Sequence, residues 1–170
     1  MPSPRTARSP DTGPVTRINA EYLETLVGYN ARRAALVIIE LFLQRMAVYA
    51  LRPVEFSVIS LIVHNPGITS RQLCSALGLL PPNLVSMIGT FEKRGLIARR
   101  PHPSDGRANG LHPTPAGEKL MREAEKSALE LENDATATLT AVERKSLIRL
   151  LKKVYLGNFD KSKNGARDGT

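Results

Sequence analysis

The sequence has a single cysteine, no tryptophan and no long apolar run. Because Cys74 stands alone among 170 residues, a disulfide framework within the chain is excluded, and the reducing cytoplasm is the expected location. The most apolar run, residues 34–43, contains Glu40 and is shorter than the about 20 residues that a membrane span needs. The basic N-terminus has no apolar stretch behind it, so no secretory signal is expected. We therefore predict no membrane partner.

Catalytic and metal-binding motifs are also missing from the sequence. We find no phosphate-binding glycine loop, no nucleophile elbow and no zinc-protease motif. His64, His102 and His112 are not spaced as metal ligands. Neither an enzyme nor a metal or cofactor site is expected.

Positive charge is what the chain has in excess. The net charge is +8 and the isoelectric point is near 10.0, which favours a polyanionic partner such as nucleic acid. Residues 91–107 hold five basic residues against only Glu92 and Asp105. The basic residues are Lys93, Arg94, Arg99, Arg100 and Arg107.

The apolar pattern predicts a mainly α protein. Residues 1–16 are rich in Pro, Ser and Arg and are expected to be disordered. Residues 17–50 form an N-terminal segment in which helical spacing predicts one helix over 19–50. Residues 114–157 predict two more helices, which begin at Thr114 and at the capping box of Thr140 and Glu143. Residues 158–170 are polar and are expected to form a flexible tail.

Residues 51–113 form the central module. A helix from Pro53 is followed by a helix over 69–77, which Thr69 and Gln72 would cap, and Gly78 supplies a turn. The next helix, 83–94, has an apolar side of Leu84, Met87, Ile88 and Phe91. Strands over 96–100 and 108–112 flank a loop over 101–106. This order describes a winged helix-turn-helix with a small β-hairpin wing, which binds double-stranded DNA.

Two groups of residues are candidates for DNA contact. The polar side of the helix over 83–94 carries Asn83, Ser86, Thr90 and Lys93, and Asn pairs bidentately with adenine. Arg99, Arg100 and Arg107 flank the hairpin loop and suit phosphate or minor-groove contact, and Asp105 would orient an arginine. The alternatives are a solvated helix face and an exposed ion pair.

The terminal helices carry more apolar surface than the module can cover. Monomers rarely expose such patches, so a homodimer built on these helices is expected, with the helices forming a dimerisation domain.

Several segments resemble the MarR family of bacterial transcription regulators. The resemblance covers about residues 20–156, and it implies a winged helix-turn-helix homodimer that binds a pseudo-palindromic operator and answers to a small phenolic ligand. It further implies that Arg107 enters the minor groove and that Asp105 holds it. Ser86 stands near a position where such helices often carry arginine. The segments are Leu51-Arg52-Pro53-Val54-Glu55-Phe56, Ile68-Thr69-Ser70-Arg71-Gln72-Leu73, Phe91-Glu92-Lys93-Arg94-Gly95-Leu96-Ile97, Asp105-Gly106-Arg107-Ala108 and Thr114-Pro115-Ala116-Gly117.

The resemblance also implies an effector site near the first long helix. The candidates for a small-molecule effector are Tyr22, Tyr29, Arg32, Arg33 and Arg45. The cluster at 29–33 resembles family members that answer to aromatic acyl-coenzyme A thioesters, whereas the arginine pair could equally serve dimer or DNA-backbone contacts. Cys74 lies outside the first helix, where peroxide-sensing members place their cysteine, so packing is the favoured interpretation.

Two functions remain after these exclusions. The first is a dimeric, ligand-relieved regulator of transcription, with repression the leading interpretation and activation left open because the sign depends on where the operator lies. The second is an architectural DNA-binding protein without sequence preference. The second would bind with steep salt dependence and almost no specificity. The basic wing argues against a third function, a winged helix used for protein contact.

Overall fold

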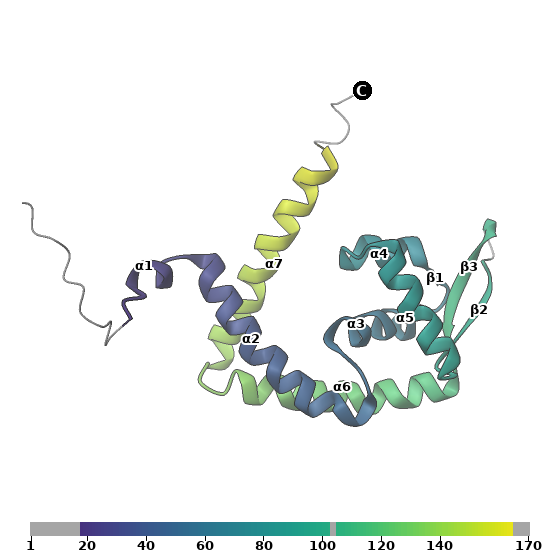
Figure 1. Cartoon of the computed structure of the whole chain (residues 1–170), viewed down its shortest axis with the longest axis horizontal. Coiled ribbons are helices and arrows are strands. Elements are labelled where there is room, and N and C mark those ends of the chain that lie inside the picture. Colours follow the sequence, from purple (N-terminus) through teal and green to yellow (C-terminus); the bar gives the residue numbers. More distant parts are fainter. Residues whose placement is uncertain (1–17, 103–104, 165–170) are drawn as a thin grey trace, which may run out of the picture. The chain divides into compact units, whose positions relative to one another are not determined.

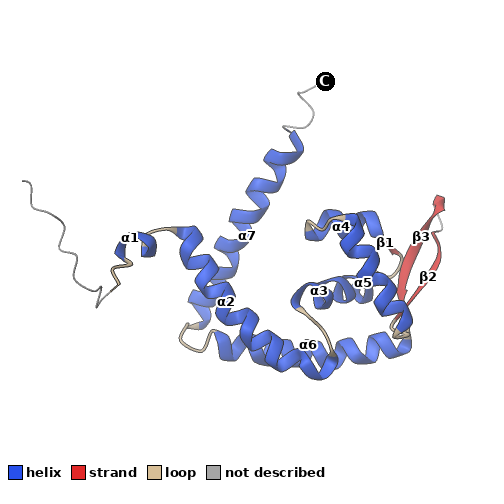
Figure 2. Ribbon diagram, viewed as in Figure 1, coloured by secondary structure: helices blue, strands red, loops and turns tan. Residues whose placement is uncertain are grey.

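The computed structural model describes residues 18–102 and 105–164, with side chains over 18–101 and 109–157. The chain divides into two units, Met1–Leu36 and Val37–Thr170, and each is described by itself. Helices predominate, and the described strands form one three-stranded antiparallel sheet (Figures 1 and 2). The predicted mainly α, winged helix fold is confirmed.

The first unit contains α1 (Glu21–Glu24) and the beginning of α2 (Val27–Met46). The prediction of one uninterrupted helix over 19–50 is wrong, because the chain breaks near Thr25. The Thr25 hydroxyl donates to the Tyr22 carbonyl at 2.8 Å, and the Asn30 amide donates to the carbonyls of Glu24 and Leu26 at 2.7 and 2.9 Å. These side chains replace backbone donors at the break, which releases the chain from a single helical path.

The second unit contains the remaining elements, and every other helix that the sequence predicts is present. After the end of α2 come η1 (Ala47–Tyr49), α3 (Pro53–His64), β1 (Ile68–Thr69), α4 (Ser70–Leu77), α5 (Pro81–Lys93), β2 (Ile97–His102), β3 (Asp105–Pro113), α6 (Pro115–Ala135) and α7 (Ala141–Asn164).

Side-chain caps set the beginnings of three of these helices. The Thr69 hydroxyl accepts from the Gln72 N–H at 3.3 Å, and the Gln72 side chain accepts from the Thr69 N–H at 2.8 Å. Thr114 caps α6, and Thr140 forms with Glu143 the same reciprocal box at the start of α7. Each cap satisfies backbone donors that the first turn of a helix leaves open, which is why the sequence located these starts well.

The sheet differs from the prediction in extent. The strands of the wing reach His102 and begin again at Asp105, where a loop over 101–106 was expected. A third strand, β1, pairs with β3 in the order β1-β3-β2. Gly110 makes room for this pairing, since a Cβ there would lie 2.8 Å from the Gly67 carbonyl oxygen. A strand of two residues is too short to show alternation in the sequence.

The C-terminal helix is also longer than predicted. Helix α7 continues to Asn164, although a loose tail was expected from residue 158. The segment has no proline, and polar residues alone do not end a helix.

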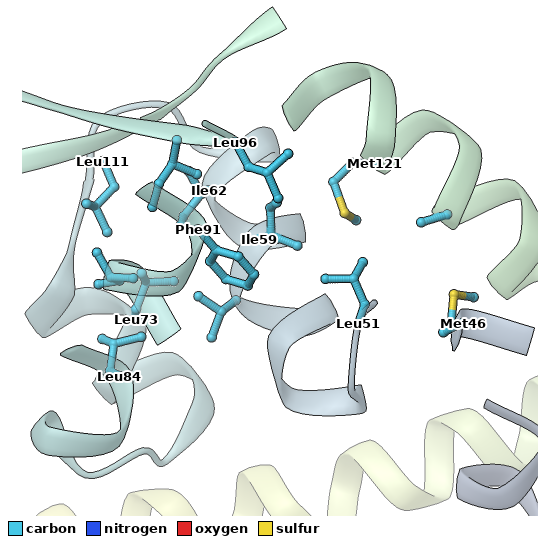
Figure 3. Packing of buried hydrophobic residues seen from close by; sticks show 14 residues of the cluster. Met46, Leu51, Ile59, Ile62, Leu73, Leu84, Phe91, Leu96, Leu111 and Met121 are labelled. Carbon is cyan, nitrogen blue, oxygen red and sulfur yellow. The ribbon is translucent and has the colours of Figure 1, made fainter. Parts of the chain in front are cut away.

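One apolar core lies between α3, α4, α5, the base of the wing and α6 (Figure 3). Phe91 and Ile88 from α5 are buried beside Ile59 and Ile62 of α3, and Met121 and Ala124 close the cluster from α6. The expected apolar side of α5 is confirmed, with Met87 only half-buried. This core fixes the face that α5 turns outward.

Over residues 18–102 and 105–164, no single helix has the length and apolar content for a membrane span; two bent helix pairs meet the test by length and composition only.

Candidate DNA-binding face

Helix α5 presents a polar face because its apolar residues are held in the core. Leu84, Ile88 and Phe91 are each at most 1% exposed, whereas Asn83 and Ser86 on other sides of the helix are exposed. Helix α4 packs against α5, and Gly78 closes α4 with a φ of +63°, a conformation that favours glycine. The sequence-predicted residues Asn83, Ser86, Thr90 and Lys93 are all exposed on α5.

The side chains in the middle of this face are small, and the space around them is open. Ser86, Gly89 and Lys93 are spaced three and four residues apart, so they share one side of α5. A Cβ placed on Gly89 would meet no atom within 4 Å. The Thr90 hydroxyl donates to the Ser86 carbonyl at 3.1 Å, so its donor is already used within the helix. Thr90 can therefore offer a base only its methyl group and an acceptor.

Three exposed residues at this face were not among the predicted site residues. Leu80, which precedes α5, is 69% exposed and Val85 is 60% exposed, and Arg71 is exposed on α4. Arg71 and Val85 line one hollow of about 250 Å³ between α4 and α5. The sequence does indicate that Val85 is exposed, because this residue falls outside the helical stripe of apolar residues that face the core.

An ion pair fixes the base of the wing to the end of α5. Arg99 in β2 donates to both carboxylate oxygens of Glu92, at 2.8 and 3.2 Å. The hydrogen bond to Glu92 raises the pKa of the Arg99 guanidinium. Glu92 thus compensates the Arg99 charge, whereas Arg100, on the opposite face of the strand, is exposed. Arg100 is the better placed of the two for a phosphate.

The two residues predicted at the wing tip lie partly beyond what the structure describes. Asp105 and Arg107 belong to β3 by their backbone, but their side chains lie outside the described residues. Their predicted pairing is a hypothesis.

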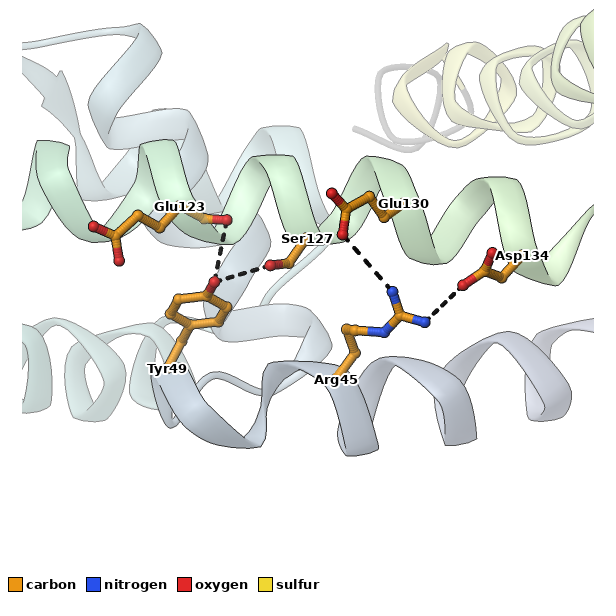
Figure 4. A network of polar contacts seen from close by, with 6 residues as sticks. All are labelled: Arg45, Tyr49, Glu123, Ser127, Glu130 and Asp134. Carbon is orange, nitrogen blue, oxygen red and sulfur yellow. Dashed lines mark hydrogen bonds and ion pairs between the residues drawn. The ribbon is translucent and has the colours of Figure 1, made fainter.

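The C-terminal end of α5 is anchored to η1 and to the residue that follows it. Arg94 donates to the carbonyls of Tyr49 and Ala50 at 2.7 and 3.0 Å. The Tyr49 hydroxyl in turn lies 2.9 Å from the Ser127 hydroxyl and donates to the Glu123 carbonyl at 3.3 Å (Figure 4). These contacts join α5 to η1 and, through Tyr49, to the middle of α6.

The predicted effector residues are distributed over both units. Tyr22 is exposed in α1, and Tyr29, Arg32 and Arg33 share a side of α2 in the first unit, where both arginines are exposed. Arg45 belongs to the second unit, where it pairs with Asp134 at 2.6 Å and with Glu130 at 4.0 Å (Figure 4). Both carboxylates are exposed, so these are surface ion pairs that link α2 to α6, and the role of Arg45 toward an effector stays a prediction.

Cys74 and His64 are potentially reactive, but both make contacts within the fold. Cys74 is half-buried and packs against the core, consistent with the packing interpretation. His64 contacts the Glu125 carboxylate at 2.7 Å, which links α3 to α6. Within the described residues, no group of three or more His, Cys, Asp or Glu side chains could hold a metal ion.

Apolar side chains remain uncovered on the outer helices. In α7, Leu147, Leu150 and Leu151 are between 41% and 50% exposed, and Leu43 of α2 is 47% exposed. Side chains of this size seldom remain in water over a contiguous surface.

Comparison with known proteins gives a consistent result. A family model described as the MarR family matches residues 51–108. A transcriptional regulatory protein for the hcr operon of Thauera aromatica is 28% identical over 130 residues, which is 76% of this chain and 78% of that protein.

Two solved structures are more similar in sequence. The transcriptional repressor CouR bound to a 23-mer DNA duplex is 34% identical, with a TM-score of 0.77, over 82% of this chain and 99% of that one. CouR bound to p-coumaroyl-CoA is 32% identical, with a TM-score of 0.70, over 82% and 98% of the two chains.

Proposed function

Because the chain belongs to the MarR family of transcriptional regulators, we propose that it is a repressor that binds a pseudo-palindromic operator as a homodimer. The observation that carries the proposal is α5, whose buried side is fixed in the core while its polar side is exposed, as are Arg99 and Arg100 at the base of the adjoining wing. A similar CouR structure is bound to a DNA duplex. The recognition helix of such a module lies in the major groove.

We assign sequence reading and phosphate binding to different residues. Asn83 and Ser86 would contact base edges, while Lys93 and Arg100 would contact phosphates, which supply much of the affinity. Arg107 would enter the minor groove at the wing, where Asp105 would orient it. Arg107→Ala should then weaken operator binding strongly and leave the oligomeric state unchanged.

The homodimer would cover the exposed apolar faces of the terminal helices. Leu147 and Leu151 lie one helical turn apart on α7, and both are more than 40% exposed in the single chain. Replacing both with glutamate should give a monomer by light scattering, with half-site affinity only. A dimer of unchanged stability would show that α7 is outside the interface.

The effector that we propose is an aromatic acyl-coenzyme A thioester. Arg32 and Arg33 are exposed and have no ion-pair partner among the described residues, so they are available to phosphate groups of the coenzyme. Tyr29 is three residues before Arg32, and a CouR structure is bound to p-coumaroyl-CoA. A tenfold loss of operator affinity would need about 1.4 kcal/mol of coupling.

Fluorescence anisotropy on the DNA that flanks the gene for this chain tests both parts. A scrambled duplex is the control, and both are titrated over a range of salt. We expect a preference of about 10³ or more for one natural site, and release by p-coumaroyl-CoA but not by p-coumarate or coenzyme A alone. Equal, steeply salt-dependent binding to all duplexes would instead identify an architectural protein.

A further inference from the structure

The beginning of α5 exposes apolar side chains on the surface that the proposed function turns toward DNA. Val85 and Leu80 are each at least 60% exposed, and Pro81 and Pro82 are exposed between them. Val85 is flanked on α4 by Arg71, which lines the same hollow of about 250 Å³ and has no ion-pair partner among the described residues. An exposed apolar side chain suits a thymine methyl in the major groove, and a cation on the neighbouring helix suits a backbone phosphate.

The same end of α5 lacks the side chains that most often read guanine. Arginine and lysine pair bidentately with guanine, yet residues 81–92 contain neither. Lys93 follows Val85 by eight residues, a rise of about 12 Å along the helix. The uncharged polar side chains of residues 81–92 that could read a base are therefore Asn83, Ser86 and Thr90, and Thr90 has already used its donor within the helix.

Apolar contact with the C5-methyl group distinguishes thymine from the other bases in the major groove. We propose that Val85 is a specificity-determining residue that contacts a thymine methyl, so that each half-site is read chiefly through A·T pairs. Arg71 would hold the neighbouring phosphate. This inference rests on the proposed function, because it requires α5 to lie in the major groove.

The test removes one methyl group from DNA and its partner from the protein. An operator is first selected from random duplexes with the full-length protein, and each thymine is then replaced by deoxyuridine, which differs only in that methyl. Burial of one methyl group corresponds to about fourfold in affinity, and to about 15-fold when both half-sites change. We expect this loss at one thymine per half-site with the natural protein, and no loss there with Val85→Ala.

Two further variants test whether the effect is specific to the methyl groups of Val85. Val142→Ala removes the same atoms from an exposed valine on α7 and should keep the deoxyuridine sensitivity. Val85→Thr keeps one of the two methyl groups and should keep part of the deoxyuridine sensitivity. Full sensitivity in Val85→Ala, or none in the natural protein on a selected operator, would overturn the role of Val85 alone. Failure to select any preferred sequence would overturn the proposed function as well.

Discussion

Gly89→Ala is expected to stabilise the fold and weaken DNA binding at the same time. Gly89 lies in the interior of α5, where glycine costs about 0.5–1 kcal/mol relative to alanine. An added Cβ would meet no atom within 4 Å, so no steric penalty offsets that gain. The melting temperature should rise by about 2–4 °C for each kcal/mol gained.

The expected cost appears only when DNA is bound. Gly89 shares a side of α5 with Ser86 and Lys93, so an alanine methyl would stand between the helix and the base edges. Overfilling a close-packed contact costs about 1 kcal/mol or more, which is roughly a fivefold loss of operator affinity.

Urea denaturation and fluorescence anisotropy on one preparation measure both effects. Gly157→Ala is the matched control, because Gly157 is interior to α7 and is equally open. It should gain stability without losing operator affinity. The reasoning is refuted if Gly89→Ala destabilises the protein, or if it binds the operator as well as Gly157→Ala does.

Three other perturbations test contacts that hold the module together. Arg94→Ala removes two hydrogen bonds to carbonyls, including that of Ala50, and should lower the free energy of unfolding by about 1–2 kcal/mol in urea denaturation, whereas Arg71→Ala should lower it by much less. Gly117→Ala would place a Cβ 2.0 Å from the Leu96 carbonyl oxygen and should lower the unfolding free energy by about 1–3 kcal/mol or more, so an unchanged value would contradict that close approach. Hydrogen bonds from Thr140 lower the pKa of Glu143, so the stabilisation it gives α7 is present above the ordinary glutamate pKa and is lost as the pH falls through the lowered one. Glu143→Gln should therefore reduce the acid sensitivity of the helical circular dichroism signal, and an unchanged acid transition would contradict this assignment.

Local sequence signals were sufficient for most helices and for the recognition helix. The capping boxes at Thr69 and Thr140 and the apolar stripe of α5 depend only on neighbouring residues, so the sequence contains them in full. The break at Thr25 was missed because it depends on side chains bonding to carbonyls, which compete with the helix only once the backbone is placed.

The contacts that organise the site were harder to predict because they join distant residues. Neither the pairing of Arg45 with Asp134 nor that of Arg94 with Ala50 has a local pattern. Arg99 was predicted as a DNA contact from its charge, and the structure shows that Glu92 compensates this charge. Val85 is apolar, so its residue type predicts burial, and only its position off the apolar stripe of α5 indicates the exposure that the structure shows.

Thr114 connects the N-terminal end of helix α6 firmly to the module. Its N–H donates to the Leu96 carbonyl, its hydroxyl donates to the Gly95 carbonyl at 2.6 Å, and the same hydroxyl accepts from the Gly117 N–H. These bonds fasten one end of a 21-residue helix to the turn between the recognition helix and the wing. At about 1.5 Å per residue the arm is roughly 31 Å long, so a tilt of about 5° moves its far end by nearly 3 Å, close to one base-pair step. Because Thr114 joins this arm to the module, a rotation of the two together about the far end of α6 would shift α5 by a similar distance relative to its half-site.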